Sequence, residues 1–543
     1  MQTLIDCLAA GEDETVRFYA CKTIENITAQ SISAGCSFAN LDVSTLLLHI
    51  YNTATDEVFK ISAAVSISHI CKLNTTLFPT IFGSFTSTNF SKALVDGAPR
   101  IQQAYITMLN IALTQPYPKL DDTLQNEEVF QIALSKLIEN QQIVLRGKTL
   151  LSYLLLFKMN PTWFIIAIEL DFYRNIDKLL RDNFKYVQCC LLCMIETVSD
   201  MCPQLINSVT DTFKKLVENK GVLQLEPAEQ NPSLGVLNVL SRSKQEFASL
   251  RGPLLLMLSF HEMLKSSSFK QKLAKGPFIE MLATIIAGCE SANSQQMNEF
   301  RKATFNVVDQ LAKHSKLLIA LHNEIIEKLL PAIADKIESK NPEVRFDALK
   351  AFSDYVTQFM CEEKVYQPLE DTLSTQLLNE LLLRKFLGNY GTIVTASEPL
   401  PNIGLKLLAV IVERNQAFVI ILKRLDLMEL LFDCFAIGHA KFNANTVKII
   451  RAIVQSREID IEELLGNKLL QRINNIMADV VKNNPEWCSD HLLCIMNEML
   501  HLAAELKKRK PESRVPQEVF DSLLVNFEYF SKLLTASDVV SNP

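Results

Sequence analysis

Residues 12–30 of this chain read EDETVRFYACKTIENITAQ, and residues 341–358 read NPEVRFDALKAFSDYVTQ. Both segments place a Val-Arg pair, an alanine and a lysine at the same spacing. The shared positions are Val16/Val344, Arg17/Arg345, Ala20/Ala348 and Lys22/Lys350. Mostly apolar residues four and seven places after the alanine complete one helical stripe, and the small alanine lets a neighbouring helix approach closely. The two segments are therefore copies of an internal repeat.

Weaker copies of the same pattern occur at residues 56–71, 97–112, 141–157 and 184–198. Further, less regular copies are found at 246–264, 297–313 and 442–456. The first copies follow one another at intervals of about 40–46 residues, which is the period of armadillo and HEAT repeats. The sequence thus predicts an all-α solenoid of armadillo/HEAT type, a right-handed superhelix of roughly a dozen repeats without a β-sheet.

Residues 220–245 lack a helical stripe and contain two prolines, which favours an interior boundary there. The predicted organisation is N-terminal armadillo/HEAT repeats over 1–219, an irregular linker or long loop over 220–245, HEAT-like repeats over 246–510, and a capping helix with a tail over 511–543. Residues 390–402 and 508–516 are expected to be surface loops.

The composition limits the classes of function. Hydrophobic residues make up 48% of the chain, and the net charge is −7, so no basic surface for nucleic acid is expected. Thirteen cysteines, with Cys71 and the group Cys189, Cys190 and Cys193 expected in apolar helices, indicate a reducing, cytoplasmic setting. The N-terminus does not resemble a secretory signal. The longest strongly apolar stretches fall short of about 20 residues, so no membrane insertion is expected.

Motifs for catalysis are missing from the sequence. It has no glycine-rich phosphate loop, no His-Arg-Asp or Asp-Phe-Gly motif and no nucleophile elbow, so we expect neither an enzyme nor a bound cofactor. Cys488, His491 and Cys494 could offer metal ligands from one helical face, but their apolar surroundings favour core packing, and no metal site is predicted. The basic run 507–510 is either an import or acidic-surface contact or, as we prefer, a solvated loop.

The position six residues after the repeat alanine is the best candidate for partner binding. It carries Asn26, His69, Asn110 and Asp354. Since the apolar stripe faces the core, this position should turn towards the concave surface, where an amide offers both a donor and an acceptor to an extended peptide. The alternative is that these amides bridge neighbouring repeats within the groove.

The segment VRFYACKTIENITAQ resembles the start of the armadillo region in Runkel-type proteins, the fourth unc-51-like kinase family, which is related to Fused. The resemblance implies a non-catalytic scaffold that binds proteins in a cytoskeletal or ciliary complex at microtubule structures such as cilia or axonemes, with a kinase or kinase-like partner. Family members carry an N-terminal kinase-like domain whose motifs do not occur here, so nucleotide binding is not carried over. A transport-type or phosphatase-type adaptor and a regulatory module of a kinase complex remain as alternatives.

Overall fold

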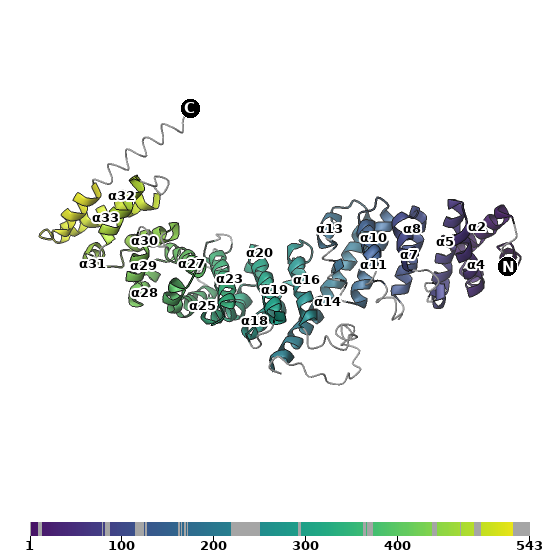
Figure 1. Cartoon of the computed structure of the whole chain (residues 1–543), viewed down its shortest axis with the longest axis horizontal. Helices are drawn as coiled ribbons and strands as arrows, with labels where there is room; N and C mark the ends of the chain where they lie inside the picture. Colours follow the sequence, from purple (N-terminus) through teal and green to yellow (C-terminus); the bar gives the residue numbers. More distant parts are fainter. Residues whose placement is uncertain are drawn as a thin grey trace, which may run out of the picture. The chain divides into compact units, whose positions relative to one another are not determined.

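A computed structural model gives the fold. It describes residues 2–8, 13–78, 87–114, 128–160, 172–218, 250–290, 295–361, 373–436, 443–466, 469–482 and 490–524, with single positions at 80, 81, 124, 163, 166, 167, 170 and 365. Within these ranges the chain forms helices joined by turns and contains no strand. The predicted all-α solenoid is confirmed (Figure 1).

The chain divides into two compact units. The first unit comprises residues 1–281 and 289–307, and the second comprises 282–288 and 308–543. α18 (Gly276–Gly288) and α19 (Gln295–Ala312) each contribute to both units. The remaining helices of the first unit are α1 (Gln2–Asp6), α2 (Glu14–Gln30), α3 (Ile32–Cys36), α4 (Leu41–Thr53), α5 (Glu57–Leu73), η1 (Thr75–Leu77), α7 (Ser87–Asp96), α8 (Pro99–Leu113), α10 (Glu128–Ile138), α11 (Ile143–Met159), α13 (Phe172–Leu179), α14 (Lys185–Glu218), α16 (Arg251–Lys265) and α17 (Lys270–Leu273).

The second unit is also built from helices, several of which are short 3-10 or π-helical segments. In the order of the chain they are α20 (Ser315–Ala320), α21 (His322–Glu324), η3 (Ile325–Leu329), α22 (Leu330–Asp335), η4 (Lys336–Glu338), α23 (Pro342–Cys361), α25 (Leu373–Leu381), η6 (Leu382–Phe386), η7 (Leu387–Asn389), α26 (Tyr390–Thr395), α27 (Leu400–Arg414), α28 (Ala417–Arg424), α29 (Met428–Cys434), α30 (Ala444–Gln455), α31 (Ile461–Gly466), α32 (Leu469–Lys482) and α33 (Asp490–Arg509).

Short polar side chains start several of these helices. The carboxylate of Asp13 accepts a hydrogen bond from the backbone N–H of Thr15 at the start of α2, and Asp56 accepts one from Phe59 at the start of α5. Asn40 caps α4 in the same way. Such caps satisfy backbone donors that the first helical turn leaves unpaired, which fixes where each repeat helix begins.

The repeat copies pack against one another in sequence order. α2 contacts α5, α5 contacts α8, α8 contacts α11 and α11 contacts α14, while α4, α7 and α10 each form a hairpin with the helix that follows. In the second unit α23, α27, α30 and α33 follow the same rule. The repeat alanines Ala20, Ala63, Ala104 and Ala348 are at most 5% exposed. Their burial confirms that the small residue lies at the helix–helix contact.

The repeat alignment predicts that Val16 and Val344 are both buried at helix–helix contacts, and this prediction is wrong for Val16. Val16 is 42% exposed, although its counterpart Val344 is fully buried. Val344 lies near the start of α23, which packs on α22 and η4. Val16 lies in the first turn of α2, which is contacted by α1 and by the carbonyl of Leu8, an acceptor for Arg17. These contacts leave the side chain of Val16 partly open to solvent.

The structure differs from the sequence prediction at one of the two expected surface loops. Residues 390–402 are mainly helical, because α26 ends at Thr395 and α27 begins at Leu400, so that loop prediction is wrong beyond the short connection. Residues 510–514 are non-helical after α33. The proposed linker 220–245 and the tail after residue 524 lie outside the described residues, and the four-part organisation stays a prediction.

α14 is much longer than the repeat copy at 184–198 predicted. By length and composition it is the one described helix that could cross a membrane, contrary to our expectation that no segment is long enough. Its residues Val187, Leu191, Met194 and Val198 are buried at intervals of three or four, and the helix contacts α11 and α16. This amphipathic pattern is that of a core helix packed in the solenoid.

The arginine of the repeat ties successive repeats together. In α11, Arg146 donates to the backbone carbonyls of Asn140 and Gln141 and pairs with Asp182, which lies before α14, at 2.9 Å. Its guanidinium also lies 5.4 Å from the centre of the Phe184 ring. Both charged side chains are only 10% exposed, so each depends on the other for compensation of its charge.

We predict that Arg146→Ala lowers the free energy of unfolding by about 3–5 kcal/mol, because it leaves the carboxylate of Asp182 buried without a counter-charge. Chemical denaturation monitored by circular dichroism measures the change. As a control, Lys178→Ala breaks an exposed ion pair with Glu139 and should cost about 0–1 kcal/mol. Equal losses in the two variants would contradict the role given to Arg146.

Candidate functional site

The candidate site is the solvent-facing stripe shared by α2, α5, α8 and α11, called here the α2–α11 face. These helices are neighbours in the first unit (Figure 1). Side-chain hydrogen bonds connect α5 to α2, α8 to α2 and α11 to α8. The face comprises Lys22, Asn26, His69, Lys72, Arg100, Gln103, Thr107, Val144, Lys148, Leu151 and Lys158.

A buried carboxylate joins three helices beneath this face. Glu25 of α2 is 4% exposed and accepts hydrogen bonds from Lys22 at 2.7 Å, from Ser62 of α5 at 2.7 Å and from Arg100 of α8 at 3.0 Å. Burial alone would raise the pKa of Glu25, but the bonds from Lys22 and Ser62 and the charges of Lys22 and Arg100 lower the pKa overall. The carboxylate is therefore ionised and already compensated.

Asn110 bridges two helices. Its side-chain N–H donates to the backbone carbonyl of Lys148 at 3.0 Å, and its oxygen accepts from the hydroxyl of Ser152 at 2.6 Å. Asn110 is 8% exposed, so the expectation that it offers a free amide is wrong. Asn110 lies six residues after the repeat alanine of α8, but its partner Ser152 does not occupy the equivalent position of α11. Equivalent repeat positions of α8 and α11 are therefore displaced from one another where the two helices meet.

The other two predicted residues of the first unit are more accessible. Asn26 is exposed, and His69 is half-buried with its Nδ1 lying 3.3 Å from the hydroxyl of Thr28. Burial lowers the pKa of His69, and the charges of Lys72 and Lys148 lower it further. The imidazole is thus neutral at physiological pH, and both residues stay predictions for partner binding.

Asp354 lies in the second unit and does not join the other three. It is half-buried on α23, near Asp309 of α19 and Lys350. Burial and the charge of Asp309 raise its pKa, against the lowering effect of Lys406 and Lys350. Lys350 pairs with Asp309 at 2.5 Å. This part of α23 is a mixed-charge surface, and partner binding by Asp354 remains a prediction.

Sequence reasoning missed the cations of the α2–α11 face. Lys148 of α11 donates to the hydroxyl of Thr107 on α8 at 2.5 Å. Burial lowers the pKa of Lys148, and the charge of Lys72 lowers it further. A count of charges on the predicted repeat helices alone could have revealed this surface.

The described cysteines do not form a metal site or an obvious nucleophile. Burial raises the pKa of Cys21 to about 11 and that of Cys71 to about 12, so both remain neutral thiols. Cys189 and Cys193 are exposed, contrary to expectation. They lie about 200° around α14 from the buried Leu191. Among the described residues no three His, Cys, Asp or Glu side chains gather as metal ligands, while Cys488 lies outside them.

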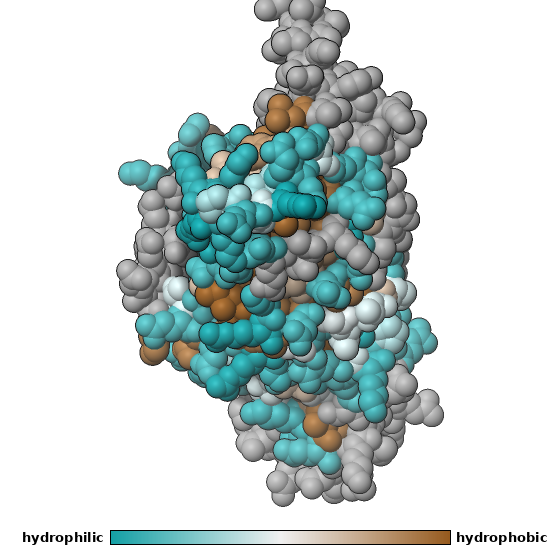
Figure 2. All heavy atoms as spheres, turned by 90° about the vertical axis from the view of Figure 1, so that its left-hand side faces the viewer, coloured by the Kyte–Doolittle hydropathy of each residue, from teal (hydrophilic) through white to brown (hydrophobic). Residues whose placement is uncertain are grey.

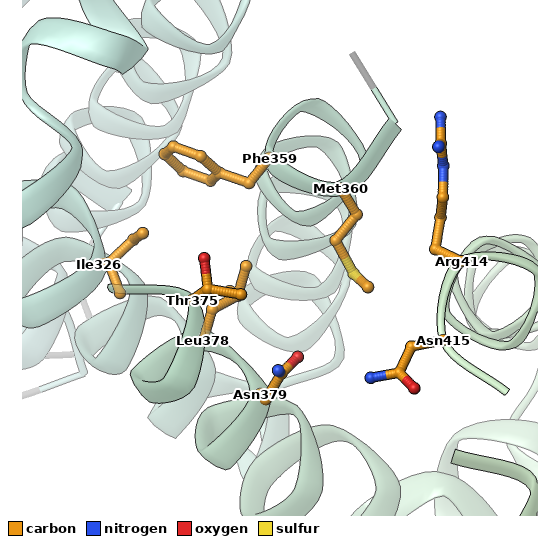
Figure 3. A pocket seen from close by; sticks show the side chains of 8 residues that line it. All are labelled: Ile326, Phe359, Met360, Thr375, Leu378, Asn379, Arg414 and Asn415. Atoms are coloured by element: carbon orange, nitrogen blue, oxygen red, sulfur yellow. The ribbon is translucent and has the colours of Figure 1, made fainter. Parts of the chain in front are cut away.

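The second unit contains a small cavity of about 50 Å³. Phe359 and Met360 of α23, Leu378 of α25 and Asn415 after α27 line it, as Figure 3 shows. A cavity of this size is far smaller than the ~300–1,000 Å³ of a cofactor site. The cavity is therefore a packing void rather than a site for a large ligand.

The surface seen in Figure 2 is mostly hydrophilic, with small separate hydrophobic groups.

We predict that Glu25→Gln lowers the free energy of unfolding by about 1–3 kcal/mol at neutral pH, since it removes the charge that Lys22 and Arg100 compensate. Because the folded pKa is lowered, the contribution of Glu25 is present above its ordinary value of 4.5 and is lost as pH falls through the folded value. Denaturation curves from neutral to acid pH should show the two proteins converging. Glu14→Gln, in an exposed first turn, is the control, and a difference that persists in acid would contradict the assignment.

We also predict that Asn110→Ala costs about 1–3 kcal/mol of folding free energy, because it removes both bridging hydrogen bonds. Asn26→Ala should change stability by less than about 0.5 kcal/mol, since its amide is exposed. Thermal and chemical denaturation of the two single variants measures the difference. A larger loss for Asn26→Ala than for Asn110→Ala would reverse this division of roles.

Comparison with known proteins supports the resemblance noted in the sequence. Residues 236–420 match the family described as serine/threonine-protein kinase ULK4-like, HEAT repeats. The chain is 26% identical over 483 residues to the serine/threonine-protein kinase RUNKEL of Arabidopsis thaliana, covering 87% of this chain and 34% of that protein. It is 20% identical over 579 residues to the serine/threonine-protein kinase ULK4 of Mus musculus, covering 99% of this chain and 42% of that protein.

The chain therefore spans less than half the length of these relatives. Among solved structures, the designed armadillo repeat protein YIII(Dq)4CqI is 12% identical with a TM-score of 0.30, covering 65% of this chain and 98% of that one. The sequence matches confirm that this chain carries a helical-repeat region of the Runkel and ULK4 type.

Proposed function

We propose that the chain is a non-catalytic scaffold that binds other proteins through the side chains of its repeat helices. The observation that carries this proposal is the α2–α11 face, on which polar and apolar side chains of four successive helices are open to solvent along one surface. Helical-repeat solenoids use such continuous surfaces to hold extended partners. A scaffold needs no more chemistry than this surface provides.

The cellular setting that we propose is a microtubule-based structure such as a cilium or an axoneme, within the cytoplasm and cytoskeleton. This setting rests on the resemblance to Runkel-type proteins. The net charge of −7 opposes long-range attraction of the chain as a whole to the acidic surface of tubulin, so we expect another protein to connect the chain to the microtubule. A kinase or kinase-like partner fits the same resemblance.

The second candidate is a transport-type or phosphatase-type adaptor, or a regulatory module of a kinase complex. A transport adaptor that binds peptide backbones would be favoured by a continuous row of free asparagines. Asn110 is instead occupied by Lys148 and Ser152. The microtubule scaffold therefore remains the preferred proposal.

The test is sedimentation of the purified chain with stabilised microtubules, alone and after addition of extract from ciliated cells. We expect little pelleting with microtubules alone and clear pelleting when extract is present, because attachment requires a connecting protein. Heat-treated extract is the control. The purified chain should also neither hydrolyse ATP nor melt at a higher temperature with nucleotide.

Absence of pelleting both with and without active extract, or a diffuse distribution of the fluorescently tagged chain in ciliated cells, would contradict the microtubule setting. Strong pelleting without extract would contradict only the need for a connecting protein. A dose-dependent stabilisation by nucleotide would contradict the non-catalytic scaffold.

A further inference from the structure

The charge of the α2–α11 face differs from that of the chain as a whole. α2, α5, α8 and α11 together contain eight Lys and Arg residues but three Glu and no Asp. The net charge of the whole chain is −7. These four helices are therefore a cationic strip in an acidic protein.

The three carboxylates of these helices do not neutralise the strip. Glu25 is buried and already bonded by Lys22, Ser62 and Arg100. Glu14 and Glu57 lie in the first turns of α2 and α5, at the edge of the face. Apart from Lys22 and Arg100, which Glu25 pairs, the cations in the middle and last turns of these helices have no ion pair with a carboxylate of the same four helices among the described residues.

Three lysines make up this uncompensated part. Lys72 lies in the last turn of α5 and Lys158 in the last turn of α11, and both are exposed, with no ion pair or hydrogen bond in the described part of the chain. Among the described residues, Lys148 donates to the neutral hydroxyl of Thr107 and forms no ion pair. The charge of Lys72 acts unfavourably on Lys148, and Lys158 adds a further cation to the same helix, so an incoming anion would be attracted to this surface.

Apolar side chains lie beside these cations. Val144 and Leu151 are 40% and 41% exposed, and they precede and follow Lys148 by one helical turn. An occupant that matches both features carries carboxylates and apolar side chains together. Neighbouring helices lie about 8–10 Å apart, so about five or six residues of extended chain at ~3.3 Å each would reach from α5 to α11.

We propose that the α2–α11 face binds an extended acidic segment of a partner protein, with carboxylates at Lys72, Lys148 and Lys158 and apolar side chains against Val144 and Leu151. This inference rests on the proposed scaffold function and specifies the chemistry of its partner. The charge complementarity selects a polypeptide rich in Asp or Glu over a basic one.

The test is fluorescence anisotropy with a short labelled peptide that repeats Glu-Leu-Glu-Ser and a matched peptide that repeats Lys-Leu-Lys-Ser. The whole chain should bind the acidic peptide at least about tenfold more tightly, with affinity falling as salt is added. The double variant Lys72→Glu and Lys148→Glu should lose about tenfold in affinity or more, since it removes two attractions and adds two repulsions.

The matched control reverses Lys92 and Lys136, which are exposed on α7 and α10 outside this face, with the same change in net charge. It should leave affinity unchanged. If Lys148→Glu impairs folding by circular dichroism, Lys72→Glu with Lys158→Glu tests the same surface through exposed residues alone.

Equal affinity for both peptides, equal losses in the face and control variants, or tighter binding of a single-stranded oligothymidylate would overturn the proposal. Extract-dependent sedimentation with microtubules separates this outcome from failure of the scaffold function. If the variants still sediment and peptide binding is unselective, the scaffold stands and its partner docks elsewhere.

Discussion

The structure depends on the fact that one repeat hairpin cannot bury its own apolar stripe. Each of α2, α5, α8 and α11 packs against the next, and the repeat alanines let the backbones come close enough to exclude water. Burial of apolar area at about 25 cal/mol per Å² supplies the driving force at each junction. Val16 of α2 is 42% exposed, whereas its repeat counterpart Val344 is buried in α23, so the burial of a repeat position depends on the helices packed around it.

Buried polar contacts make these junctions specific. Apolar packing tolerates small shifts of one helix along another, whereas a buried ion must meet its partner at one position. Arg146 with Asp182, and Glu25 with Ser62 and Arg100, join residues that are 36 to 75 positions apart in the sequence. We infer that these contacts set the register between repeats, and that the repeat arginine recurs for this structural purpose rather than for partner binding.

The same arrangement leaves a surface for function. When apolar stripes and paired charges face inward, the remaining side chains of successive helices form one solvent-facing row. On α5 and α11 that row carries Lys72, Lys148 and Lys158, and on α11 the exposed Val144 and Leu151 lie beside Lys148. A solenoid thus obtains a long recognition surface from residues that folding does not use.

The sequence by itself determined the helical-repeat fold, because the alanine, the apolar positions and the spacing of the copies repeat within the chain and act locally. It also placed Ala20 and Ala348 in the core. It did not reveal that the amide of Asn110 bonds to Lys148, or that the charge of Glu25 is compensated by Arg100. Those bonds run from one helix to another, between residues that do not hold equivalent repeat positions. Only the tertiary structure decided which members of the predicted row, Asn26 and His69 rather than Asn110, remain accessible, since burial depends on the neighbouring helix and not on the repeat position alone.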